Sequence, residues 1–286
     1  GKFFGPTRLR TAIIKSRNMV SIRLLRIIGQ KLARQHASKF GFNADALPKD
    51  LTLALGSGAV TPMQLAEGYT IFANGGYHVK PYFIERIESA EGKVIYRPNI
   101  QRVCDLKCQR LASELAAHER ELEELGIEFT QVSNNNAPRV IDEANIYQIS
   151  SMLRDVVQHG TGRKARVLGR KDIAGKTGTT NEQRDAWFAG FHPQVVTTVW
   201  VGFDEHQPLG RSEFGGAAAL PIWIDYMRTA LRDVAEVKAV LPAYMIQLNI
   251  NPETGLLVSP DDPKGVPEVF HIDHVPAFDQ SFQAEP

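Results

Sequence analysis

Three segments typical of β-strands follow one another closely in the second half of the chain, and they constrain the fold more than any other feature. They cover residues 172–179, 186–191 and 195–203, and the last is rich in Val, Thr and Trp. Only short polar loops separate them. Short connections suit antiparallel pairing, because a parallel pair needs a long crossover. The sequence therefore predicts a three-stranded antiparallel meander.

Helical patterns flank this meander in the sequence. Apolar residues recur at helical spacing over residues 7–34 with a polar break at 15–18, over 62–73, over 145–157 and over 217–232. Pro221 near the start of the last segment suits the first turn of a helix. Helices packed against an antiparallel sheet define an α+β fold.

The rest of the chain predicts smaller units. We expect one main domain over residues 1–242, with an insertion at about 80–140, followed by a C-terminal strand and an extended tail over 243–286. The insertion combines a hairpin, with strands at 83–87 and 93–96, and an amphipathic helix with leucines at 111, 115, 122 and 125. Residues 245–250 alternate as a strand does.

Composition excludes several classes of protein. The 286 residues are 43% hydrophobic and 23% charged with a net charge of +1, so neither disorder nor bulk attraction to nucleic acid is expected. No apolar run reaches the length of about 18 residues that spans a bilayer. The two cysteines, Cys104 and Cys108, could form a local disulfide or stay as free thiols. His118, His159 and His192 lack metal-ligand spacing, and no cofactor is predicted.

The segment Gly175-Lys176-Thr177-Gly178-Thr179-Thr180-Asn181 carries the strongest chemical signal. A lysine, three hydroxyls and two glycines can bind an anion while the backbone approaches the ligand. A phosphate-binding loop is excluded, because five residues separate Gly169 from Gly175 and strand-like sequence follows where a helix is needed. The alternative is an edge strand that holds a substrate carboxylate. Asp185 and Trp187, which follow it, are assigned to a surface loop and to the core.

A second polar element, Ser16-Arg17-Asn18, lies about 160 residues upstream in the break between two helical segments. Taken alone, Ser16 and Asn18 suit helix caps or turns. Their other interpretation is a Ser-x-Asn element whose side chains face a cleft.

Together these segments resemble the transpeptidase domain of class A, bifunctional penicillin-binding proteins, which are penicillin-recognising serine acyltransferases. The similarity rests on motifs in family order and extends to about residue 230. The motifs are Leu9 to Asn18, Thr61 to Ala66, Phe72 to Gly76, Gly160-Thr161-Gly162, Lys176 to Asn181 and Ala186 to Phe191. Glu268-Val269-Phe270 is a weaker match, because Asp273 follows it where the family has glycine.

The resemblance implies a reaction and roles for these residues. A serine attacks the D-alanyl carbonyl of a D-Ala-D-Ala stem peptide, and the acyl group then passes to an amine of a neighbouring strand; β-lactams mimic the donor. By the resemblance, Ser16 relays a proton, Asn18 binds the acyl-side amide and Lys176 supplies positive potential. Thr177 and Thr179 bind the donor carboxylate, Gly178 gives the acyl group room, and the Thr179 N–H is half of the oxyanion hole.

The family's nucleophile belongs to a Ser-x-x-Lys motif, and none occurs in the 286 residues. We therefore expect the chain alone to be inactive. The resemblance further implies an upstream glycosyltransferase domain and membrane anchor at the periplasmic face of the bacterial inner membrane. Two other interpretations remain open: a D,D-carboxypeptidase or serine β-lactamase, and a non-catalytic scaffold that binds peptidoglycan or protein partners.

Overall fold

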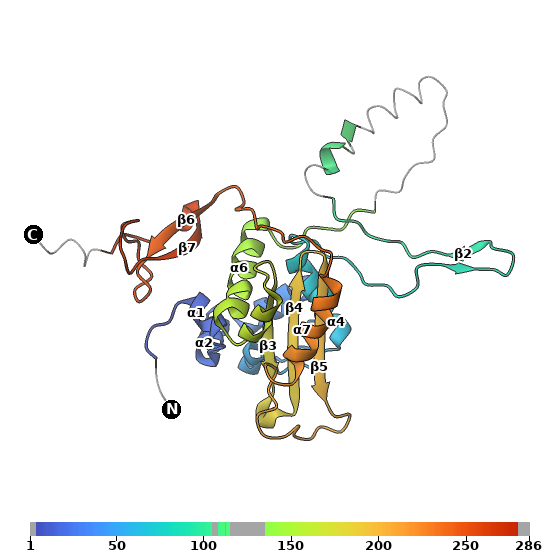
Figure 1. Ribbon diagram of the computed structural model, residues 1–286, viewed down its shortest axis with the longest axis horizontal. Helices are drawn as coiled ribbons and strands as arrows, with labels where there is room; N and C mark the ends of the chain where they lie inside the picture. The colour runs from blue at the N-terminus through green and yellow to red at the C-terminus, as the bar shows by residue number, and fades with distance from the viewer. Residues whose placement is uncertain (1–3, 105–107, 112, 115–134, 280–286) are drawn as a thin grey trace, which may run out of the picture.

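The computed structural model describes residues 4–104, 108–111, 113–114 and 135–279. At its centre, β3 (Ala174–Thr179), β4 (Asp185–His192) and β5 (Val195–Gly202) form an antiparallel sheet in the order β3-β4-β5. The register pairs Lys176 with Ala189 and Gly190 with Thr197. The predicted meander and the α+β class are confirmed, and β3, which carries the Lys-Thr-Gly segment, has β4 on one side only (Figure 1).

Helices cover both faces of this sheet (Figure 1). On one face, Trp223 of α7 (Ala219–Ala230) packs edge-on against Phe188 of β4, with ring centroids 4.9 Å apart. On the other face, Phe72 of α4 (Pro62–Ala73) stacks on Phe191. Phe188 and Phe191 point to opposite sides because side chains alternate along a strand. Helix α6 (Glu143–His159) packs along β3.

Local sequence explains where these helices begin. Thr61 and Gln64 form a reciprocal capping box at the start of α4, and Pro62 occupies its first turn. The Asp142 side chain accepts a hydrogen bond from the Asn145 N–H at the start of α6. Three short 3-10 helices flank the sheet and its helices at Leu51–Leu55, Arg163–Leu168 and Asn181–Gln183.

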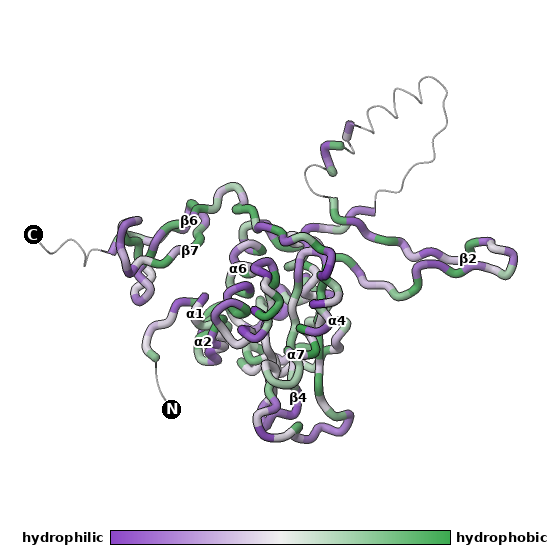
Figure 2. The backbone as a smooth tube through the Cα atoms, viewed as in Figure 1, coloured by the Kyte–Doolittle hydropathy of each residue, from purple (hydrophilic) through white to green (hydrophobic). Residues whose placement is uncertain are grey.

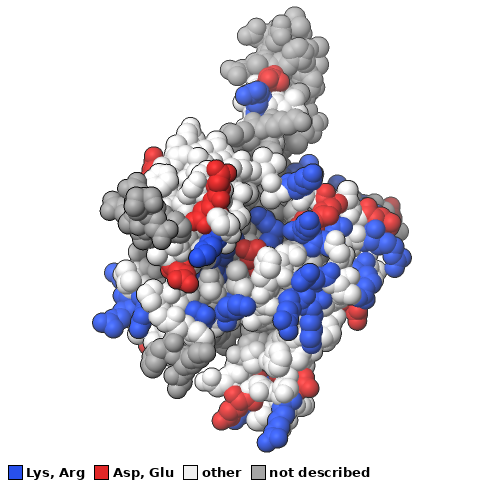
Figure 3. Space-filling view, turned by 60° about the vertical axis from the view of Figure 1, so that its left-hand side comes forward, with Lys and Arg blue, Asp and Glu red and all other residues white. Residues whose placement is uncertain are grey.

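The N-terminal region contains three helices where the sequence predicts two. These are α1 (Leu9–Ile14), α2 (Asn18–Ile28) and α3 (Gln30–Ala37), followed by a 3-10 turn at Ser38–Phe40. The second predicted helix is divided into α2 and α3 because Gly29, with φ of 87°, ends α2. Residues 7–39 contain nine Lys and Arg and no Asp or Glu. Figure 3 shows more Lys and Arg than Asp and Glu side chains on one face of the molecule, although the net charge of the chain is only +1.

The part of the insertion that contains β1 (Ile87–Glu88) and β2 (Val94–Tyr96) projects from the body as an arm (Figure 1). The two short strands pair antiparallel as the predicted hairpin requires, but the first covers only the end of the predicted 83–87 segment. Hydrophobic stretches extend along this arm (Figure 2). Cys104 and Cys108 are joined by a disulfide, so the free-thiol alternative is wrong. The predicted helix with leucines at 111, 115, 122 and 125 lies largely outside the described residues.

The C-terminal region differs from the predicted extended tail. After the expected strand β6 (Met245–Ile250), a second strand β7 (Val266–His271) pairs with it, and the short 3-10 turn Ile272–His274 includes Asp273. The sequence pattern missed β7 because its stability depends on pairing with β6 and on contacts outside the segment.

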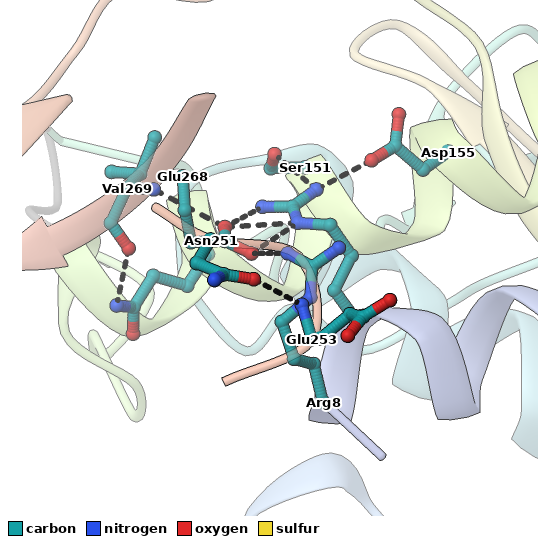
Figure 4. Close-up of polar contacts among 9 residues, drawn as sticks. Arg8, Ser151, Asp155, Asn251, Glu253, Glu268 and Val269 are labelled. Atoms are coloured by element: carbon teal, nitrogen blue, oxygen red, sulfur yellow. Dashed lines mark hydrogen bonds and ion pairs between the residues drawn. The ribbon is translucent and has the colours of Figure 1, made fainter. Parts of the chain in front are cut away.

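Those contacts centre on Glu268 of β7 (Figure 4). Its two carboxylate oxygens share the single Arg10 Nε–H, each at 2.9 Å from Nε, and Oε1 also accepts from Arg10 Nη2 at 2.5 Å. The same guanidinium donates to Asp155 and Ser151 of α6. Arg10 lies on α1, so one side chain ties the C-terminal hairpin to both α1 and α6.

A buried polar cluster fixes the end of the sheet that carries the start of β3. His192 donates from Nε2 to Asp172, because its Nδ1 accepts the Gln194 N–H and therefore carries no proton. Asp172 also accepts hydrogen bonds from Arg170 and the Val237 N–H. Burial lowers the pKa of His192 although Asp172 opposes this effect, so the ring is neutral near pH 7.

No helix of the described residues is long and apolar enough to cross a membrane.

Candidate active site

The turn after α1 places Ser16. The Arg17 N–H bonds to the Ala12 carbonyl and the Ser16 N–H to the Ile13 carbonyl, which is the Schellman arrangement that ends many helices. Ser16 occupies the left-handed position of this motif with φ of 50°, where glycine is usual. A side chain there costs about 1 kcal/mol of backbone strain. Serine is therefore present despite the backbone preference, which suggests that its hydroxyl is needed.

Lys176 of β3 reaches this hydroxyl. Its Nζ lies 2.9 Å from Ser16 Oγ and 2.9 Å from the Thr177 carbonyl oxygen. Burial lowers the pKa of the Lys176 ammonium to about 8. The backbone of Ser16 belongs to the turn that ends α1, whereas its hydroxyl caps no helix: it accepts from Lys176, and α2 has no side-chain cap.

Asn18 is the first residue of α2 and is exposed. Its side chain makes no hydrogen bond within the described part of the chain, so it is not a cap and its amide is available to a ligand. Arg17 points elsewhere: it donates to Thr7 and lies over the Phe4 ring, 4.1 Å from the centroid. The Arg17 side chain therefore makes its contacts with Phe4 and Thr7 and not with the site that Ser16 faces.

The threonines of β3 also have defined partners. Thr177 Oγ1 lies 2.7 Å from Thr161 Oγ1, and Thr179 Oγ1 accepts the Gly215 N–H at 3.0 Å. A Cβ on Gly215 would lie 2.2 Å from the Trp187 carbonyl oxygen and 2.4 Å from that of Gly178, so only glycine fits there. Sequence reasoning assigned no role to Thr161 or Gly215; the Gly-Thr-Gly and Gly-Gly sequences were the available signals.

Asp185 closes the turn between β3 and β4. It is the first residue of β4 and is half-buried, so its assignment to a surface loop is wrong. Its carboxylate accepts from Trp200 Nε1 at 2.9 Å and contacts His206 and Thr180. Burial raises the pKa of Asp185, but these hydrogen bonds outweigh it and hold the pKa below the ordinary value. Trp187 is half-buried beside Trp200, not in the core.

The arrangement suits an anionic ligand. One ammonium, hydroxyls on neighbouring strand positions and the basic N-terminal helices provide positive potential and hydrogen-bond donors for a carboxylate. No cluster of three or more His, Cys, Asp or Glu side chains that could hold a metal ion occurs among the described residues.

A Lys-Thr-Gly strand beside a Ser-x-Asn turn, on an antiparallel sheet between helices, is the arrangement expected of penicillin-recognising acyltransferases. The sequence matches the family described as penicillin binding protein transpeptidase domain over residues 2–228. The chain belongs to this family.

Individual relatives agree with this assignment. Penicillin-binding protein 1A of Pseudomonas aeruginosa is 45% identical over 96% of this chain and 35% of its own length. The Vibrio cholerae protein of the same name is 36% identical over 94% of this chain and 34% of its own length. The crystal structure of Haemophilus influenzae penicillin-binding protein 1A is similar with a TM-score of 0.81 and 33% identity, covering 96% of this chain and 41% of that one. The chain therefore spans about a third of the length of these curated relatives.

Proposed function

We propose that this chain supplies the substrate-binding part of a serine D,D-transpeptidase site that cross-links peptidoglycan stem peptides. The contact between Lys176 Nζ and Ser16 Oγ carries the proposal, because it joins the two motifs into one polar site. Lys176, Thr177 and Thr179 would hold the terminal carboxylate of a D-Ala-D-Ala donor. Gly178 leaves room for the acyl group, and Asn18 would bind its amide.

In the proposed reaction, the serine of a Ser-x-x-Lys motif attacks the penultimate D-alanine carbonyl, and the Thr179 N–H stabilises the resulting oxyanion. The carbon–nitrogen bond then breaks, and the departing D-alanine amine receives a proton through Ser16, which lies within hydrogen-bond reach of Lys176. An amine of a second stem peptide takes the acyl group and restores the serine. The 286 residues contain no Ser-x-x-Lys, so the nucleophile would come from sequence outside this chain.

The wider context is proposed on the resemblance and the relatives. A class A enzyme would also carry a glycosyltransferase domain and a membrane anchor upstream and would work at the periplasmic face of the inner membrane. A carboxypeptidase or β-lactamase would use the same site with water as acceptor. A scaffold without catalysis gives no reason for serine at the strained position of Ser16.

Labelling with a fluorescent penicillin tests the proposal. We expect the full-length protein that contains this chain to be labelled covalently, and the 286-residue chain alone to remain unlabelled. Replacement of the serine of an upstream Ser-x-x-Lys by alanine is the matched control and abolishes labelling. An unlabelled full-length protein would refute the proposed function, and labelling of the isolated chain would refute the assignment of the nucleophile.

A further inference from the structure

A hydroxyl outside the assigned motifs lies next to Thr177. Thr161 Oγ1 is 2.7 Å from Thr177 Oγ1, and either oxygen can be the donor. Thr161 follows the end of α6, and its side chain is exposed. A single contact between two exposed hydroxyls stabilises a fold only slightly. The contact therefore matters for the site that the two residues share rather than for stability.

The loop that carries Thr161 is held in place from two sides. A Cβ on Gly160 would lie 2.5 Å from the Ile14 carbonyl oxygen, so the loop contacts the end of α1 two residues before Ser16. A Cβ on Gly162 would lie 3.4 Å from the Phe188 ring. Glycine at position 160 therefore lets the backbone approach α1 closely, and the Phe188 ring lies at ordinary contact distance behind position 162, which together set the position of Thr161 beside β3.

The direction of the hydroxyl protons decides what this contact can do. A threonine hydroxyl has one proton and two acceptor lone pairs. Thr177 can donate its proton to a carboxylate only if its contact with Thr161 uses Thr161 as donor. Thr179 has the same relationship with a different partner: the Gly215 N–H donates to Thr179 Oγ1 and leaves the Thr179 proton free.

We propose that Thr161 is a positioning residue of the carboxylate site. Its O–H donates to Thr177 Oγ1, so the Thr177 proton is directed toward the ligand and the bond to the anion is strengthened by polarisation. Thr161 and Gly215 thus act as paired donors behind the two threonines of β3. The inference rests on the proposed function, whose ligand is an anionic carboxylate.

The test compares a penicillin that has its free carboxylate with the methyl ester of the same compound. The second-order rate of acylation is measured in the full-length protein for wild type, Thr161→Val, Thr161→Ser and Thr177→Val. Valine keeps the shape of threonine and removes the hydroxyl. We expect Thr161→Val to lower the rate with the free carboxylate about five- to tenfold, as loss of one hydrogen bond between two neutral hydroxyls implies, and to leave the ester rate unchanged. Thr161→Ser keeps the wild-type rate.

The double variant Thr161→Val/Thr177→Val distinguishes action through Thr177 from an independent contact. We expect it to be no slower than Thr177→Val alone. An equal loss with acid and ester indicates a structural role and overturns the inference, as does a wild-type rate for Thr161→Val with the free acid. If the wild-type protein reacts with neither compound, the proposed function itself is refuted.

Discussion

The ammonium of Lys176 and the hydroxyl of Ser16 are 2.9 Å apart, although 160 residues separate them in the sequence. The contact joins the edge strand β3 to the turn between α1 and α2. Serine in a left-handed conformation supplies the acceptor, and burial lowers the pKa of the donor to about 8. Both properties are unfavourable for folding, and five predictions test this description and the packing that supports it.

Ser16→Gly separates folding from function. Glycine relieves the backbone strain at φ of 50° but has more entropy to lose, so we expect the free energy of unfolding to change by less than about 1 kcal/mol. Penicillin acylation of the full-length protein should fall by about a hundredfold or more if Ser16 relays a proton. Ser16→Ala is the control that keeps a side chain and lacks the hydroxyl. A Ser16→Gly protein with the wild-type rate excludes the relay role.

Lys176 makes stability depend on pH in the alkaline range. Its pKa is about 8 in the folded chain against an ordinary value of 10.5, so between these values the unfolded chain binds more protons. Stability should therefore rise with pH from about 8 to 10.5, and the destabilising effect should be fully present at pH 7. Urea unfolding at several pH values measures this slope. Lys176→Met should remove it, and an unchanged slope would contradict the assignment.

The charge of Lys176 also predicts a kinetic effect. If the ammonium holds the donor carboxylate, penicillin acylation should decline as the pH rises through about 8. Lys176→Arg keeps its charge throughout this range, so it should be slower from altered geometry but show no decline. Parallel declines in both proteins would assign the titration to another group.

Gly215→Ala should disrupt the site because the new Cβ would lie 2.2 Å from the Trp187 carbonyl oxygen, which belongs to the sheet backbone. We expect a loss of at least about 2 kcal/mol in the free energy of unfolding. Gly265→Ala is the matched control, since its nearest heavy atoms are 3.1 Å away and it lies outside the site. Equal losses of unfolding free energy in the two variants would show that the close contact at Gly215 does not cause the destabilisation.

Glu268→Gln should release the C-terminal hairpin from α1 and α6. The Glu268 and Arg10 side chains are each 12% exposed, and removing the Glu268 charge leaves Asp155 as the remaining carboxylate partner of Arg10 among the described residues. We expect a loss of about 3 kcal/mol and faster hydrogen exchange in β6 and β7. Asp225→Asn, which breaks the exposed pair with Arg228, should cost less than about 0.5 kcal/mol. A similarly small effect of Glu268→Gln would show that other contacts hold the hairpin.

Local sequence patterns predicted much of the architecture. The alternating segments at 172–203 predicted β3, β4 and β5 and their antiparallel order, and the helical segment at 62–73 coincides with α4. These elements depend on side-chain periodicity, short connections and capping groups a few residues away, all of which can be read along the chain. The family motifs also identified Ser16 and Lys176 as candidates before their contact was known.

Contacts between distant segments were decided only by the tertiary structure. The pairing of β7 with β6, the contact of Thr161 with Thr177 and the close approach of Gly215 to β3 and β4 each depend on which surfaces pack together. The Gly-Thr-Gly and Gly-Gly sequences mark two of these places but do not name the partners. Trp187 is apolar and was expected in the core, yet it lies half-buried against Trp200. Sequence by itself indicated most of the strands and helices, though not β7 or the break at Gly29, and which groups could react. Packing determined which of those groups meet, since hydroxyl and ammonium contacts require positions fixed to within an ångström or so by the whole fold.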